Sequence, residues 1–142
     1  MNVKQKTFLD TNVLVYQFDR AAIDKQKKAV TLIEKCLKDD SAVISTQVVQ
    51  EFINVAVKKF DTQLPTREVD VVVTNLLKPL CAHYPTLDFY KRALSLYSAH
   101  SLSFYDALII QAAIDLGCDI VYSEDLQDGQ QFGNLTIINP FH

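Results

Sequence analysis

The sequence predicts one domain of the α/β class, built on a parallel sheet. Short apolar segments alternate along the chain with longer segments in which apolar residues recur at helical spacing. This alternation is typical of parallel strands joined by helices. Only three glycines and four prolines interrupt the 142 residues, so we expect short loops and mainly helical structure. The chain is long enough for one buried core, and the predicted domain spans residues 1–142.

Each predicted element has a local signal in the sequence. The predicted strands are the segment ending at Leu9 and residues 42–45, 81–84, 119–122 and 135–138. The predicted helices cover residues 12–18, 22–39, 46–59, 66–77, 87–100 and 103–116. Pro79 is expected to end the fourth helix, and Gly117 stands where a helix C-cap belongs. Residues 123–134 are predicted to form a polar loop.

The composition excludes several classes of protein. A formal net charge of -3 gives no global positive field, which disfavours a simple nucleic-acid-binding module but not an enzyme that meets phosphates through cations. Three widely spaced cysteines without a C-x-x-C pair indicate buried thiols in a reducing compartment. The sequence shows no signal peptide and no apolar run of membrane-spanning length, so we expect a cytoplasmic protein. Glycine-rich nucleotide-binding motifs are also absent.

Asp10 stands where the first predicted strand ends and a new pattern begins. Phe8 and Leu9 suit a buried strand, and the following Asp-Thr-Asn consists of turn- and cap-forming residues before an apolar segment. In an open α/β sheet, ligands bind at the carboxyl ends of the strands. Asp10 is therefore a candidate site residue, although this stretch alone is equally compatible with a simple helix cap.

Glu51 is placed on the apolar face of its predicted helix, with Val48 and Val55 at i−3 and i+4. An inward-facing carboxylate is costly unless it has a partner. A buried lysine or arginine could be that partner, but no basic residue lies within one turn of Glu51. A functional site is the other interpretation.

Two further acids are candidates with respectable alternatives. Asp106 has apolar residues at i−4 and i+4 and so faces the core side, but with Ser103 it also fits a capping box. Asp125 follows the fourth predicted strand, in a loop that could simply be solvated. Glu124 and Asp128 are expected to be the exposed members of that loop.

The four acids are more informative together than singly. Two come from strand ends and two from inward helix faces, and such elements can converge at one edge of a parallel sheet. Each pair of carboxylates at ~5 Å costs on the order of 3 kcal/mol at an effective dielectric of ~20. The cluster therefore needs protons, basic partners or a cation. Oxygen ligands without histidine or cysteine suit Mg²⁺ or Mn²⁺, which bind phosphates and activate water.

Other residues have ordinary explanations. Lysines of the second predicted helix, Lys25 among them, are expected to form a solvated face, with RNA phosphate contact as the less favoured interpretation. Five aromatic residues fall at core-facing spacing and need no functional role: Phe8, Phe52, Tyr90, Tyr97 and Phe104.

Four segments, taken jointly, resemble the PIN (PilT N-terminus) domain family, and most closely its VapC-type toxin ribonucleases. These segments are residues 9–14 (LDTNVL), 46–51 (TQVVQE), 103–109 (SFYDALI) and 123–126 (SEDL). Asp10, Glu51 and Asp106 match the core acids of the family, and Asp125 matches its more variable fourth acid. Two supporting residues also match: Asn12, beside the first acid, and Ser123, before the fourth. The loop 126–132 departs from the commoner short Asp-x-Asp-Phe ending.

The resemblance implies a five-stranded parallel sheet of order 3-2-1-4-5, flanked by helices. It also implies a ribonuclease dependent on Mg²⁺ or Mn²⁺, with Asp10, Glu51, Asp106 and Asp125 as catalytic metal ligands. The implied role is the toxin of a type II toxin–antitoxin pair, with RNA as substrate and a cognate antitoxin as partner. A homodimer is a further possible assembly, and no membrane partner is expected.

Two other interpretations remain open at this stage. The chain could be a catalytically silent α/β module that binds RNA or a protein, although such a scaffold has no need of a repelling acidic cluster. It could also be a phosphoacceptor signalling domain. The lack of a downstream lysine at a strand end and the inward-facing Glu51 weigh against that second interpretation.

Overall fold

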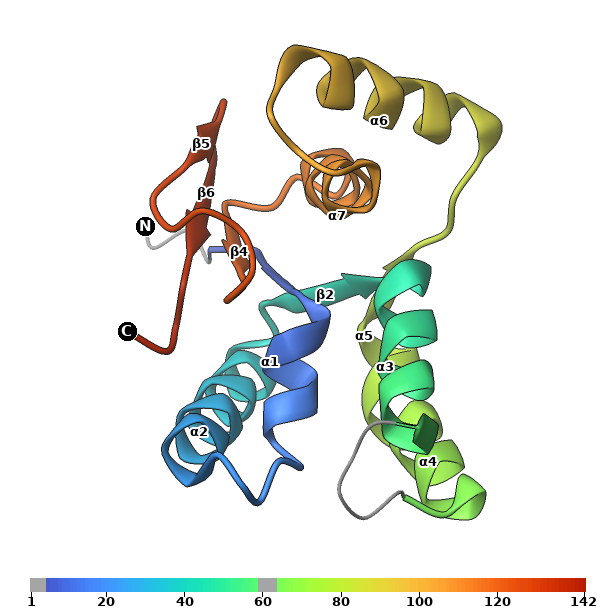
Figure 1. Ribbon diagram of the computed structural model, residues 1–142, viewed down its shortest axis with the longest axis vertical. Coiled ribbons are helices and arrows are strands. Elements are labelled where there is room, and N and C mark those ends of the chain that lie inside the picture. Colours follow the sequence, from blue (N-terminus) through green and yellow to red (C-terminus); the bar gives the residue numbers. More distant parts are fainter. Residues whose placement is uncertain (1–4, 59–63) are drawn as a thin grey trace.

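A largely parallel sheet forms the centre of the computed structural model, which describes residues 5–58 and 64–142 (Figure 1). The strand order is β3-β2-β1-β4-β6-β5. The strands are β1 (Thr7–Leu9), β2 (Ala42–Ser45), β3 (Cys81–His83), β4 (Ile120–Tyr122), β5 (Gln131–Phe132) and β6 (Leu135–Ile138). Phe8 of the central β1 is paired with Val43 on one side and Val121 on the other. The α/β class and the order of the five parallel strands are therefore as predicted.

The prediction of five strands is wrong by one. The short β5 lies inside the predicted polar loop and pairs antiparallel with β6. The two strands are joined by Gly133 and Asn134, and Gly133 has a φ of 62°, which favours a two-residue hairpin turn. Phe132 of β5 is buried. A single apolar residue in a polar stretch gave no usable strand signal.

The helices follow the predicted positions closely, with one exception. They are α1 (Thr11–Tyr16), α2 (Ile23–Asp39), α3 (Thr46–Lys58), α4 (Thr66–Val72), α5 (Lys78–Leu80), α6 (Leu87–Ala99) and α7 (Phe104–Asp115), with the π-helical segment η1 (Val73–Leu77) between α4 and α5. The predicted end of the third helix at residue 59 lies outside the described residues. Gly117 follows α7 with a φ of 71°, as expected of a helix C-terminus.

Pro79 does not end the fourth helix, contrary to the prediction. The helical path continues from α4 through η1 into α5, and Pro79 lies within it. A proline ring crowds the carbonyl four residues earlier, here that of Asn75, and Asn75 belongs to the π-helical segment. The π-helical segment thus covers the position that the ring would crowd, and the helical path continues where a break was expected.

The helices cover the sheet from two sides. In Figure 1, α6 and α7 lie together on one side of the sheet, and α1 and α2 lie on the other. The core between them includes Phe8, Leu9, Phe52 and Val121, none of which is exposed. None of the described helices is long and apolar enough to cross a membrane.

The exposed surface of α6 carries apolar side chains that the sequence pattern had assigned to the core. Tyr90 and Tyr97 are 40% and 45% exposed, so their assignment to the core is wrong. Phe89 and Ala93 are the buried residues of this helix. The cause is that α6 packs mainly against α7, and one neighbour covers only one narrow face. Large apolar side chains on the remaining faces stay at the surface.

Candidate active site

Asp10 lies at the carboxyl end of the central strand, as the sequence predicted. Its backbone N–H donates to the carbonyl of Tyr122, which extends the pairing of β1 with β4 by one residue. Its side chain is buried and accepts two hydrogen bonds. Thr11 N donates to Oδ1 at 2.8 Å, and the Ser123 hydroxyl donates to Oδ2 at 2.7 Å. Asp10 is thus the cap of α1, but the second bond ties it to a distant loop as well.

The carboxyl of Asp10 is electrostatically unusual. Burial raises its pKa from 3.8 to about 6, against the lowering effect of the hydrogen bonds from Ser123 and Thr11. The charges of Glu51 and Asp125 raise the pKa further. The difference from 3.8 corresponds to on the order of 3 kcal/mol in favour of the neutral form. Three of the four predicted acids therefore interact in the fold.

Glu51 is half-buried and has neutral partners. Thr11 Oγ1 donates to Oε2 at 3.2 Å, and Gln47 Nε2 donates to Oε1 at 2.8 Å. No lysine or arginine within residues 5–58 and 64–142 forms an ion pair with it. The interpretation of Glu51 as half of a buried ion pair is therefore not supported. The charge of Glu51 instead raises the pKa of Asp10.

Asp106 is half-buried in the first turn of α7. Its backbone N–H donates to the Ser103 hydroxyl at 3.1 Å, so Ser103 caps the helix as the sequence indicated. Gln47 Nε2, which binds Glu51, also donates to the carbonyl of Tyr105 at 3.2 Å. This shared donor brings the start of α7 next to Glu51. The charges that raise the Asp10 pKa do not include that of Asp106, so it is the least integrated of the three core acids.

Asp125 is exposed and is held by Asn12. Asn12 Nδ2 donates to Asp125 Oδ2 at 3.1 Å, while Asn12 Oδ1 accepts from the backbone N–H of Glu124 at 3.2 Å. The Ser123 hydroxyl accepts from the backbone N–H groups of Asp125 and Leu126, both at 3.2 Å. The two predicted supporting residues thus position the loop that carries the fourth acid.

Sequence reasoning missed several residues around the acids. Glu124 was expected to be exposed, but it is half-buried and accepts from the Tyr16 hydroxyl at 2.7 Å. Lys25 was assigned to a solvated face, but its ammonium lies 2.8 Å from Glu124 and over the ring of Tyr16. These pairs join segments far apart in the sequence, and no local pattern signals them. Gln47 had a usable signal, because it precedes Glu51 by one helical turn.

The donor chemistry of the site suits a hard divalent cation. The candidate ligands are carboxylates, which Mg²⁺ and Mn²⁺ prefer. Among the residues described, no three or more His, Cys, Asp or Glu side chains form a ready-made metal-binding group. Mg²⁺ is commonly held by one or two carboxylates and keeps several waters, so it does not require such a group. The acids around Asp10 therefore fit the cation that the sequence suggested.

Comparison with known proteins identifies the family. No curated protein matches the chain. A crystal structure of FitAcB from Neisseria gonorrhoeae is similar over 96% of this chain and 99% of that one, with 16% identity and a TM-score of 0.64. A structure of FitAB bound to an IR36 DNA fragment is similar over 96% of each chain, with 18% identity and a TM-score of 0.63. The PIN domain family matches residues 7–127, which include all four acids. The chain belongs to the PIN domain family.

Proposed function

We propose that this protein is a metal-dependent ribonuclease that hydrolyses RNA phosphodiester bonds. The observation that carries the proposal is the interaction of acids from separate segments at the end of β1. The charges of Glu51 and Asp125 both act on the buried carboxyl of Asp10, and no basic side chain of the described residues pairs with any of these three. Such a cluster is costly without a cation, and a structural role does not require it. Membership of the PIN family supports nuclease activity in general.

Four acids would hold Mg²⁺ or Mn²⁺ at this edge of the sheet: Asp10, Glu51, Asp106 and Asp125. When bound, the cation would supply Lewis-acid stabilisation of the phosphate and lower the pKa of the attacking water. The chain itself prepares the ligands. Ser123 and Thr11 fix the two oxygens of Asp10, and Asn12 fixes Asp125. Hydrolysis in this family's manner would leave 5′-phosphate and 3′-hydroxyl ends.

Glu51 has a second role in the proposal. Thr11 and Gln47 each bind one of its oxygens, which holds the carboxylate towards the site from the side of α3. A carboxylate in this position can orient the attacking water by accepting a hydrogen bond from it.

We further propose that the ribonuclease is the toxin of a type II toxin–antitoxin pair and acts in the cytoplasm. Its antitoxin would cover the acids with a basic side chain, and a guanidinium suits this role because it binds carboxylates in a bidentate manner. A homodimer is the other assembly proposed. FitAB is seen bound to DNA, but this chain has a net charge of -3, so we assign any DNA contact of a comparable complex to the antitoxin.

The test is cleavage of assorted RNAs by purified protein with Mn²⁺, Mg²⁺ or EDTA. We expect cleavage with either metal, none with EDTA, and none with Asp10→Asn, because an amide is a poor ligand for a hard cation. Glu34→Gln removes an exposed charge from α2 and should cleave normally. Near-wild-type turnover by Asp10→Asn would remove Asp10 from the site. If no RNA is cleaved under any condition, the silent binding module becomes the better interpretation.

The toxin role needs a separate test. Expression of the protein alone should arrest growth, and co-expression of the neighbouring gene product should relieve the arrest. If the protein alone is harmless and no neighbouring product binds it, the toxin role is wrong even if the nuclease activity is real.

A further inference from the structure

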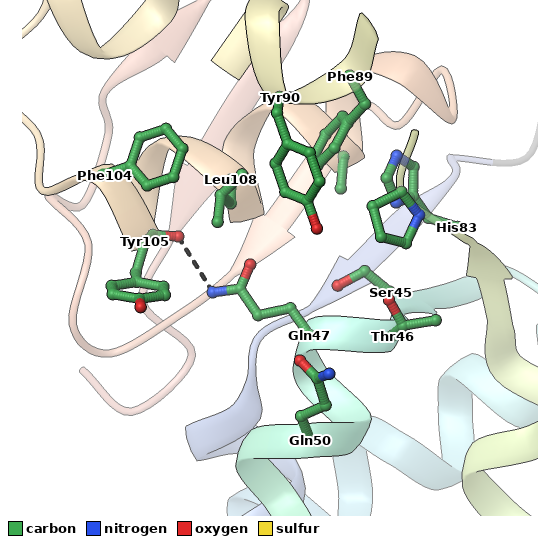
Figure 2. Close-up of a pocket in the computed structure, with 12 residues that line it drawn as sticks. Ser45, Thr46, Gln47, Gln50, His83, Phe89, Tyr90, Phe104, Tyr105 and Leu108 are labelled. Atoms are coloured by element: carbon green, nitrogen blue, oxygen red, sulfur yellow. Dashed lines mark hydrogen bonds between the residues drawn. The ribbon is translucent and has the colours of Figure 1, made fainter. Parts of the chain in front are cut away.

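A pocket of about 290 Å³ lies beside the acids, between the ends of β2 and β3, the first turns of α3, and the helices α6 and α7 (Figure 2). The aromatic part of its wall is formed by Phe89 and Tyr90 of α6 and by Phe104 and Tyr105 of α7. The volume is near the lower end of the roughly 300–1,000 Å³ range of small-molecule sites. It therefore suits one planar ring system rather than a folded segment.

Gln47 connects this pocket to the acidic site. Its side chain lines the pocket, and its Nε2 donates to Glu51 at 2.8 Å and to the Tyr105 carbonyl at 3.2 Å, the bond drawn in Figure 2. Tyr105, another wall residue, immediately precedes Asp106. A strand with a phosphodiester at the acids would therefore bring an adjacent nucleotide to the pocket.

Among the residues that the structure describes, none that lines the pocket is a lysine, arginine, aspartate or glutamate. Burial lowers the pKa of the His83 imidazole, which lines the pocket, and so disfavours a positive charge there. A pocket without a cation is a poor site for a phosphate, whereas it suits a neutral ring. The amide of Gln50, which is exposed, adds both a donor and an acceptor at the pocket.

We propose that this pocket binds one unstacked base of the RNA substrate and so selects a nucleotide beside the cleaved bond. Tyr90 points from α6 toward Gln47 and offers a ring for stacking, and Gln50 offers an amide for the edge of the base (Figure 2). Stacking on aromatic residues and hydrogen bonds to base edges are the usual means of reading unpaired RNA. The identity of the ligand rests on the proposed ribonuclease function, but base binding can be measured without catalysis.

The binding experiment uses the four ribonucleosides, which lack phosphate, as probes of the Asp10→Asn protein in saturation-transfer NMR. We expect at least one nucleoside to bind, and Tyr90→Ala and Gln50→Ala, each added to Asp10→Asn, to weaken its binding about fivefold or more. Both side chains are exposed at the pocket, so these truncations spare the core. The matched control is Tyr84→Ala, which removes a tyrosine that is 67% exposed and lies outside the pocket, and it should not affect binding.

The outcomes separate this proposal from the proposed function. If no nucleoside binds, or if binding is unchanged in Tyr90→Ala and Gln50→Ala, the pocket is not a base site. If N-acetyl-tyrosinamide displaces the nucleosides and binds more tightly than any of them, the pocket serves a protein side chain and the proposal is wrong. Nucleoside binding in a protein that cleaves no RNA would support the pocket while the nuclease function fails.

The cleavage experiment tests selectivity in the active protein. Wild-type protein and Tyr84→Ala should share a base preference beside the cleaved bond in a randomised RNA, and Tyr90→Ala should lose that preference while still cleaving with Mn²⁺. A preference that survives in both Tyr90→Ala and Gln50→Ala would overturn the proposal and leave the nuclease function intact.

Discussion

The hydroxyl of Ser123 donates a 2.7 Å hydrogen bond to Oδ2 of Asp10, across 113 positions of the sequence. The Ser123 hydroxyl oxygen also accepts hydrogen bonds from the backbone N–H groups of Asp125 and Leu126. One fully buried hydroxyl therefore fixes the first acid and the start of the loop that carries the fourth. This connection makes Ser123 a sensitive position for the stability and the electrostatics of the site.

Replacing Ser123 with alanine should destabilise the metal-free protein by about 1–3 kcal/mol at neutral pH, because it leaves a buried carboxylate and two backbone donors without their partner. The free energy of unfolding, measured by urea denaturation, checks this prediction. Ser101→Ala is the matched control, because Ser101 is exposed and should tolerate the change. Equal effects of the two substitutions would contradict the assigned role of the Ser123 hydroxyl.

The stability of the metal-free protein should depend on pH through Asp10. Its folded pKa of about 6 lies above the ordinary 3.8, so the fold favours the neutral carboxyl. That contribution is complete below the unfolded pKa and is lost as pH rises through the folded value. With EDTA present, the protein should therefore be more stable near pH 5.5 than near pH 7.5, by about 0.8 kcal/mol.

Asp10→Asn should remove this trend, since an amide does not titrate. The comparison is needed because His83 has the opposite effect. Burial lowers the pKa of His83, so its contribution to the stability of the folded protein is lost as pH falls. Denaturation curves of both proteins from pH 5 to 8 provide the measurement. Parallel pH profiles for wild type and Asp10→Asn would show that the Asp10 carboxyl does not titrate as proposed.

A divalent cation should stabilise the fold near neutral pH. At tenfold over its dissociation constant, Mn²⁺ would add ~1.4 kcal/mol. Asp106→Asn should reduce that gain without lowering the stability of the metal-free protein. The cap of α7 uses the backbone N–H of residue 106, which asparagine keeps.

Glu34→Gln, the exposed charge control, should respond to Mn²⁺ as wild type does. Thermal melts with and without Mn²⁺ distinguish these cases, and an unchanged Mn²⁺ effect in Asp106→Asn would mean that Asp106 is not a ligand.

The sequence by itself determined the class of the fold and the candidate acids. Apolar runs of strand length alternate with helical periods, and these local patterns survive because burial of one face is what stabilises each element. Asp10 could be placed at a strand end for the same reason, and Glu51 on an inward helix face. The hairpin of β5 escaped prediction because its pairing depends on one turn and one apolar ring, Phe132.

Only the tertiary structure decided which groups act on one another. The bonds from Ser123 to Asp10 and from Asn12 to Asp125 each span 113 positions, so no sequence period relates their partners. The raised pKa of Asp10 has the same origin, since burial comes from packing of the whole chain around β1. The exposure of Tyr90 follows from how little of α6 its neighbours cover. Local patterns specify elements, whereas long-range packing sets the distances, burial and charge interactions on which chemistry depends.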